Sequence, residues 1–149
     1  MILRSRTPAA GWPSTPRLLL RTPSGDLLNT INACTLLRRL QGLLGRRSLG
    51  PNEACLLRPC NAVHMLGMRF AIDVVWLDAR GRVLAIHEAV PPGLHVRLLL
   101  SAYAALEVAA GRARSLGLVP GARIECGAEP IARHRTTPGV TGESFLIQK

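Results

Sequence analysis

Short apolar stretches, separated by turn-forming residues, make up most of this chain. In residues 70–77 the apolar side chains occupy both alternating faces, and Asp73 is the only polar residue. The next four residues, Asp-Ala-Arg-Gly, suit a turn, and residues 82–90 are again largely apolar, so the two stretches predict a β-hairpin. The same pattern predicts further strands at residues 16–21, 27–34, 54–57, 95–100, 102–109 and 122–125.

One segment has helical spacing instead. The leucines at positions 36, 37, 40, 43 and 44 fall on one face of a helix. Thr35 suits the N-terminal cap and Gly45 the left-handed position at the C-terminus, so a helix is predicted over residues 35–45. Residues 112–116 suit a single helical turn. Short strands with one or two short helices are typical of a mainly β fold, an antiparallel sandwich or barrel.

The length of 149 residues fits one domain. Residues 1–16 and 127–149 lack periodicity and predict disordered, flexible tails, which leaves a single β-rich domain at residues 17–126. No apolar run approaches the roughly 20 residues of a membrane-spanning helix. The N-terminus lacks the apolar core of a secretory signal, and no two cysteines form a C-x-x-C pair. We therefore expect a cytoplasmic protein whose cysteines remain thiols.

The formal net charge is +10, from 19 basic and 9 acidic residues. Such a field favours acidic partners, nucleic acid or anionic lipid, although a solvated basic surface also accounts for it. Arg38, Arg39, Arg46 and Arg47 form a candidate phosphate-binding patch around the predicted helix. Aromatic residues make up only 3% and no stacking motif is visible, which argues against nucleic acid as the partner.

Asp73 raises a chemical question, because an ionised carboxylate among apolar side chains is costly unless it is paired or hydrogen-bonded. His64, nine positions earlier, is the expected partner, with Arg69 and backbone N–H groups as the other candidates. A buried Asp–His pair is either a structural clamp or an acid/base unit. Glu107 is a second acid within an apolar strand, and a solvent-facing side of an antiparallel sheet accounts for it.

Cys60, His64 and Met68 recur at intervals of four, and sulfur and imidazole ligands suit copper(I). Pro59 and Gly67 argue against the regular helix that would bring these side chains onto one face. We therefore expect a loop that leads into a strand, and we predict neither a metal site nor a cofactor. The sequence contains no catalytic-serine motif, P-loop or dinucleotide-binding motif.

Three stretches together resemble domain-of-unknown-function family 192, a bacterial and archaeal family of small β-rich domains. They are RLQGLLGR at residues 39–46, CNAVHMLGMRFAIDVVWLD at residues 60–78, and LEVAAG at residues 106–111 followed by GLVPG at residues 117–121. The resemblance covers about residues 18–126. It implies a compact β-barrel or jelly-roll-like sandwich with a helix packed across it.

The resemblance implies no established activity. Some members have been associated with pilus assembly or secretion, which suggests a protein partner of that class. Many members look exported, and this chain differs from them in lacking a signal sequence. The family positions that carry over are His64, Gly67, Met68, Asp73 and Glu107. Met65 and Leu66 stand where many members have Trp or Thr, so contacts made there differ.

Three functions remain open. The favoured one is a non-catalytic, ligand- or protein-binding accessory domain whose candidate pocket contains His64, Met68, Asp73 and Glu107. The second is a small enzyme that uses His64 and Asp73 as an acid/base pair, with Cys60 as a candidate nucleophile. The third is a phosphate or nucleic-acid binder, which requires the four arginines of the basic patch on one exposed face.

Overall fold

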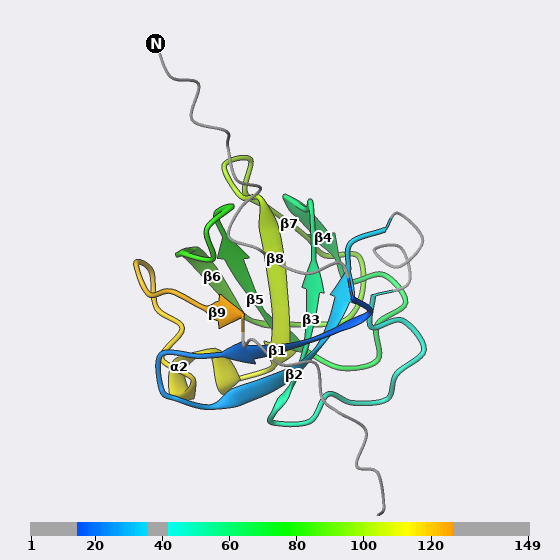
Figure 1. Ribbon diagram of the computed structural model, residues 1–149. Coiled ribbons are helices and arrows are strands. Elements are labelled where there is room, and N and C mark those ends of the chain that lie inside the picture. Colours follow the sequence, from blue (N-terminus) through cyan, green and yellow to red (C-terminus); the bar gives the residue numbers. More distant parts are fainter. Residues whose placement is uncertain (1–14, 36–41, 127–149) are drawn as a thin grey trace, which may run out of the picture.

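The computed structural model describes residues 15–35 and 42–126. Within these ranges the chain forms nine strands and one short helix (Figure 1). The helix is α2 (Arg112–Ser115). The strands are β1 (Arg17–Arg21), β2 (Leu27–Ala33), β3 (Glu53–Leu57), β4 (Ala62–His64), β5 (Ile72–Leu77), β6 (Val83–Val90), β7 (Val96–Leu98), β8 (Ala104–Ala109) and β9 (Glu125–Cys126).

Seven strands form one curled sheet in the order β6-β5-β8-β3-β2-β1-β9, and β4 and β7 form a separate two-stranded sheet. The two ends of the large sheet meet beside β6 and β9. An isolated bridge joins Arg82 to Arg123 there, and the Val83 N–H donates to the Ala122 carbonyl at 2.8 Å. The curled sheet is therefore a half-barrel whose edges touch at one end.

The mainly β prediction is confirmed, with two differences in detail. Strands β2 and β3 pair in parallel, whereas the sequence predicted antiparallel strands. The connection between them spans residues 34–52, which is long enough to return the chain to the same edge in the same direction. The short strand β4 was expected to be a loop. The predicted helix at residues 35–45 falls mostly on residues 36–41, outside the described residues.

The first core fills the inside of the half-barrel. Large side chains of β1, β2, β3, β5 and β8 point into it, and α2 closes one end with Ala113. Its largest fully buried members include Leu20, Leu28, Leu56 and Leu106. Burying side chains of this size supplies most of the stability of a small domain.

A second core lies on the opposite face of β3, β5 and β8. Trp76, Val74 and Cys55 project into it, and Val63 of β4 and Met65 cover them from the other side. The two-stranded sheet therefore acts as an outer layer over the half-barrel (Figure 1). Because both faces of β5 are covered, all six of its residues are buried.

The first core predicts a large cost for truncating a central side chain. Leu106→Ala should lower the free energy of unfolding by about 2–5 kcal/mol, because the substitution removes buried methylenes and leaves a cavity. Equilibrium urea denaturation measures this change. The exposed Leu94 is the matched control, and Leu94→Ala should change the free energy of unfolding by less than about 0.5 kcal/mol. A comparable loss in both variants would contradict this description of the core.

Candidate functional site

Asp73 is fully buried, and its carboxylate is satisfied by backbone N–H groups. The Ala89 N–H donates to Oδ1 at 2.8 Å, and the Ala113 N–H donates to Oδ2 at 3.0 Å. The first donor belongs to β6 and the second to the start of α2. Asp73 therefore joins the helix that closes the half-barrel to the neighbouring strand.

A β-bulge explains why one of these donors is available. Ile72 pairs with Val90, but Val74 pairs with His87, so two residues of β6 lie opposite Asp73. Ala89 is one of the two, and it has a positive φ of 48°. A bulged residue loses its partner in the strand ladder. The Asp73 carboxylate accepts the hydrogen bond that Ala89 would otherwise lack.

The predicted pairing of His64 with Asp73 is wrong. His64 is exposed on β4, in the two-stranded sheet, whereas Asp73 is buried in the seven-stranded sheet. The other predicted donor type, the backbone N–H group, is the one found. The acid/base alternative thus loses the pair of side chains on which it depends.

Glu107 lies on the opposite face of the sheet from Asp73. In the β5–β8 pairing Asp73 faces Val108 of the first core, whereas Glu107 faces Val74 of the second core. Met68 is half-buried against this second core. The predicted pocket of His64, Met68, Asp73 and Glu107 is therefore divided among three places: the first core, the second core and the outer surface.

Glu107 is also far less exposed than expected. Only 6% of its surface is accessible, so the prediction of a solvent-facing position is wrong. The outer layer that contains β4 and β7 covers the face that the sequence pattern assigned to solvent. Burial raises the pKa of Glu107 to about 8, which means that the carboxyl is largely protonated at neutral pH.

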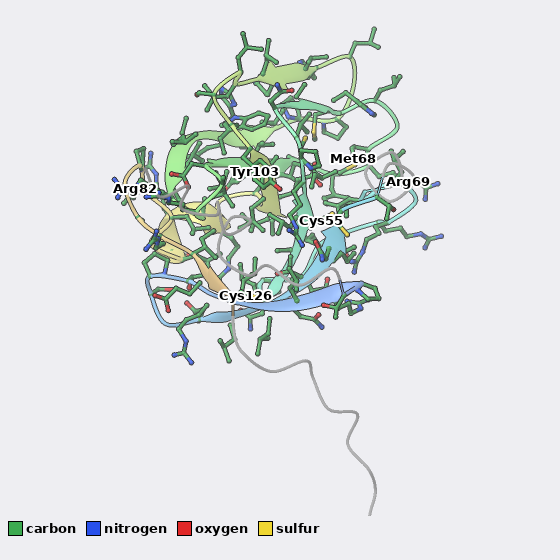
Figure 2. The ribbon with its side chains drawn as sticks, turned by 45° about the horizontal axis from the view of Figure 1, so that its top comes forward. Cys55, Met68, Arg69, Arg82, Tyr103 and Cys126 are labelled. Carbon is green, nitrogen blue, oxygen red and sulfur yellow. The ribbon has the colours of Figure 1, made fainter. Side chains whose placement is uncertain are left out.

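Cys55 lies directly across from Glu107 on β3. Burial raises the pKa of the Cys55 thiol above its usual range. Figure 2 shows Cys55 on the same side of the molecule as Met68 and Arg69, with Arg82 on the other side. A buried thiol beside a protonated carboxyl is chemically inert, because nucleophilic attack requires the thiolate.

The indole of Trp76 has a partner that the sequence did not reveal. Its Nε1–H donates to Nδ1 of His87 at 3.0 Å, and the two rings meet edge to face with centroids 6.2 Å apart. The desolvated surroundings, and secondarily the charge of Arg97, lower the pKa of His87. Neutral His87 keeps Nδ1 free to accept this hydrogen bond. His87 thus satisfies a buried indole.

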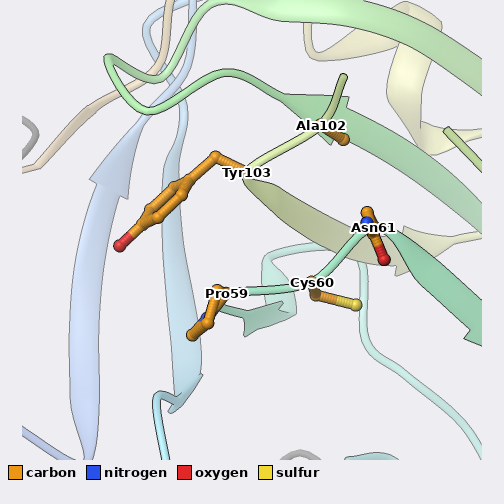
Figure 3. A pocket seen from close by; sticks show the side chains of 5 residues that line it. All are labelled: Pro59, Cys60, Asn61, Ala102 and Tyr103. Atoms are coloured by element: carbon orange, nitrogen blue, oxygen red, sulfur yellow. The ribbon is translucent and has the colours of Figure 1, made fainter. Parts of the chain in front are cut away.

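A small cavity of about 180 Å³ opens where β3 ends and β8 begins. It is lined by Pro59, Cys60, Asn61, Ala102 and Tyr103 (Figure 3). The Cys60 thiol donates to the Ala62 carbonyl at 3.1 Å. Ligand pockets usually measure about 300–1,000 Å³, and none of the four residues of the predicted pocket lines this cavity. It is too small to hold more than a few waters or a very small molecule.

Of the predicted basic patch, Arg38 and Arg39 lie outside the described residues. Arg46 forms an ion pair with Glu53, with Nη2 3.0 Å from Oε2. A hydrogen bond from the Gly50 N–H, and secondarily the bond from Arg46, lowers the pKa of Glu53. Arg47 is exposed. One of the two described arginines of the patch is therefore already engaged by a carboxylate.

Exposed apolar side chains occur on β7 and in the segments next to the β4–β7 sheet. Every second residue from 94 to 100 belongs to this group, and Leu66, 58% exposed, lies in the turn after β4. We call these five residues the apolar strip. The exposed fractions of the other four are 88% for Leu94, 62% for Val96, 54% for Leu98 and 77% for Leu100. Exposed apolar side chains that gather in one region are a feature of interaction sites in soluble proteins.

No helix in the described ranges is long and apolar enough to cross a membrane. No group of three or more histidine, cysteine or acidic side chains in the described ranges is arranged to hold a metal ion. All four cysteines are outside disulfide bonds.

The sequence matches the model of one protein family, described as "Uncharacterized ACR", over residues 22–126. The chain belongs to domain-of-unknown-function family 192 (DUF192). The predicted resemblance is thereby confirmed. No curated protein matches this DUF192 domain in sequence.

Two solved structures are similar to the DUF192 domain. A protein of Sinorhizobium meliloti 1021, described as a candidate transcription regulator, is 29% identical with a TM-score of 0.64, and the match covers 74% of this chain and 92% of that one. A protein of unknown function from Novosphingobium aromaticivorans DSM 12444 is 24% identical with a TM-score of 0.65, and covers 81% of this chain and 94% of that one. The second likeness concerns the fold alone.

The hydrogen bonds of Asp73 predict that it stabilises the fold independently of His64. Asp73→Asn should lower the free energy of unfolding by about 1–3 kcal/mol, because the new amide turns an N–H group toward a buried backbone N–H. His64→Asn, on the exposed face of β4, should have almost no effect. Urea denaturation of both single variants and the double variant measures the coupling energy between them, which should be near zero. A coupling above about 1 kcal/mol would restore the predicted pair.

The buried carboxyl of Glu107 predicts a stability that depends on pH. Below pH 4.5 it is protonated in the folded and the unfolded chain. Between pH 4.5 and about 8 the unfolded chain releases the proton while the folded chain keeps it. The free energy of unfolding should therefore fall as the pH rises through this range, by an amount on the order of a few kcal/mol.

Glu107→Gln should remove that part of the pH dependence. Urea denaturation at intervals from pH 4 to pH 9 measures it as the difference between the wild type and the variant. Glu125→Gln, at an exposed position on β9, is the matched control and should leave the pH profile unchanged. Parallel profiles for the wild type and Glu107→Gln would show that Glu107 is ionised in the folded protein.

Proposed function

We propose that this DUF192 domain is a non-catalytic protein-binding module, and that the apolar strip is its docking face. The main observation is the exposure of Val96 and Leu98 on one face of β7, together with Leu94 before the strand and Leu100 after it: all four are more than half exposed. Leaving so much apolar surface in water costs free energy, and covering it with a partner recovers this free energy. Only the inner face of β7 lies against the second core, so packing of that core does not cover the outer face.

Charge supports an acidic partner. The segments that carry the apolar strip, residues 60–72 and 90–104, contain Arg69, Arg97, His64 and His95 but no aspartate or glutamate. The chain as a whole has a net charge of +10. Complementary charge raises the rate of encounter and excludes wrong partners. We therefore commit to one occupant, a protein segment that presents apolar and acidic side chains together.

A second copy of this chain suits the strip less well. Two copies would bring the same cationic segments together, and each would add a net charge of +10. Like charges that face one another across an interface weaken the association.

The enzymatic alternative has less support. Asp73 is engaged by two backbone N–H groups, and Glu107 is on the opposite face of the sheet. The nucleic-acid alternative draws on the description of the Sinorhizobium meliloti protein, but Arg46 of the predicted patch is ion-paired. The partner class suggested by the family resemblance, a pilus-assembly or secretion component, is a protein and agrees with the proposal. Cysteines outside disulfides suit a reducing compartment such as the cytoplasm.

A defined acidic peptide tests this proposal. The probe is a fluorescein-labelled octapeptide of alternating valine and glutamate, and fluorescence polarisation measures its affinity for the full chain. Leu94→Ser with Leu98→Ser should weaken binding by about tenfold or more, because two apolar contacts are lost. Val119→Ser, at an exposed apolar position outside the strip, should leave the affinity unchanged.

Three results would count against the proposal. The first is equal binding by the wild type and the Leu94/Leu98 variant. The second is binding to anionic lipid vesicles that requires the apolar strip while the peptide does not bind. The third is self-association of the wild type, seen by sedimentation, that the same leucine substitutions abolish.

A further inference from the structure

We infer that the partner segment binds as an added β-strand along the free edge of β7, with its apolar and acidic side chains alternating. The inference rests on the proposed function, because it concerns the same face and the same occupant. It adds the mode of binding and the side-chain pattern of the partner. Strand addition is a general way of recognising an extended segment, in which main-chain bonds supply affinity and alternate side chains supply specificity.

The hydrogen bonds between β4 and β7 determine which groups of β7 face outward. The Leu99 N–H donates to the Asn61 carbonyl at 2.9 Å, and the Met65 N–H donates to the His95 carbonyl at 2.9 Å. In an antiparallel pair, hydrogen-bonded and non-hydrogen-bonded positions alternate. His95, Arg97 and Leu99 therefore direct their backbone groups toward β4.

Val96 and Leu98 occupy the intervening positions, opposite His64 and Ala62. Their N–H and carbonyl groups consequently point away from β4, along the other edge of β7. Within the described residues, no hydrogen bond involves the N–H of Val96 or of Leu98, and β7 has no second strand beside it. An edge of this kind is a template for one more strand.

The two faces of β7 differ in a way that specifies the incoming side chains. Val96 and Leu98 point outward, whereas Arg97 faces the second core, because its pairing partner Val63 is a member of that core. A residue placed directly opposite Val96 or Leu98 shares their outward face and is best apolar. The residues between them fall on the face of Arg97 and are best acidic.

Without a partner, Arg97 covers part of the free edge of β7. Its Nη1 donates to the Val96 carbonyl at 3.1 Å, which occupies one acceptor of the free edge. A carboxylate on the incoming strand offers the guanidinium a stronger, charge-assisted bond. When Arg97 turns to that carboxylate, the Val96 carbonyl becomes available to an N–H of the partner. A neutral segment provides no such exchange.

Backbone methylation of the octapeptide tests the mode of binding. One version carries an N-methyl group on every valine and the other on every glutamate, so that the two peptides have the same side chains and the same number of methyl groups. With the peptide antiparallel to β7 and its valines opposite Val96 and Leu98, the valine N–H groups face β7. Methylated valines should weaken binding by about tenfold or more, whereas methylated glutamates should change the affinity by less than about twofold.

Hydrogen exchange gives a second readout on the protein itself. Binding of the unmethylated peptide should slow exchange of the Val96 and Leu98 amides, while the Arg97 amide, already paired with β4, should change little. Arg97→Gln should reduce the preference for the glutamate peptide over its glutamine counterpart by about fivefold.

The outcomes separate the two proposals. If the peptide binds and the serine variants weaken it, but both methylated peptides bind equally and no amide of β7 gains protection, the docking face stands and strand addition is refuted. If the unmethylated peptide does not bind the wild-type chain at about 1 mM, the proposed function fails together with this inference.

Discussion

The covering of β5 and β8 on both faces is the constraint that shapes this domain. A strand between two cores has no wet side, so every polar group on it must be satisfied by the protein or lose its charge. Asp73 satisfies the first condition, with bonds from the β6 bulge and from α2. Glu107 satisfies the second, because burial raises its pKa to about 8. Both acids are therefore buried, Asp73 fully and Glu107 with 6% of its surface accessible.

The second core also explains where a partner has room to bind. The second core is covered by a sheet of only two strands, β4 and β7. Each strand of a two-stranded sheet has one edge without a neighbouring strand, and one face of the sheet lies away from the core. The inner face supplies Val63 to the core. The outer face carries exposed leucine and valine, with cationic and no acidic residues in the same segments. A layer that is needed for folding on one side thereby becomes a candidate interface on the other.

Most of the strands were predictable because they are local patterns. Strand β5 and its hairpin partner β6 were predicted from the apolar residues on either side of an Asp-Ala-Arg-Gly turn. The limits of both strands lie within two residues of the predicted ones. Strand β4 was missed because three residues of mixed character carry no period. The partner of Asp73 was missed because the Ala89 N–H is released by a bulge, and a bulge depends on the register between two strands. The partner of Trp76 depends on that same register.

The sequence alone determined the fold class and the family, and it showed that Asp73 and Glu107 lie among apolar residues. Each of these features is encoded in neighbouring positions of the chain. Only the tertiary structure decided that Asp73 and Glu107 face opposite cores, that His64 is on the surface, and that Glu107 is covered. Alternation along a strand distinguishes its two faces but does not say what lies against each of them. A strand with two apolar faces and a strand with one exposed apolar face have similar sequences, and only the packing of distant segments separates them. For the same reason, the sequence predicted a strand at residues 95–100 but did not show that Val96 and Leu98 of β7 are exposed.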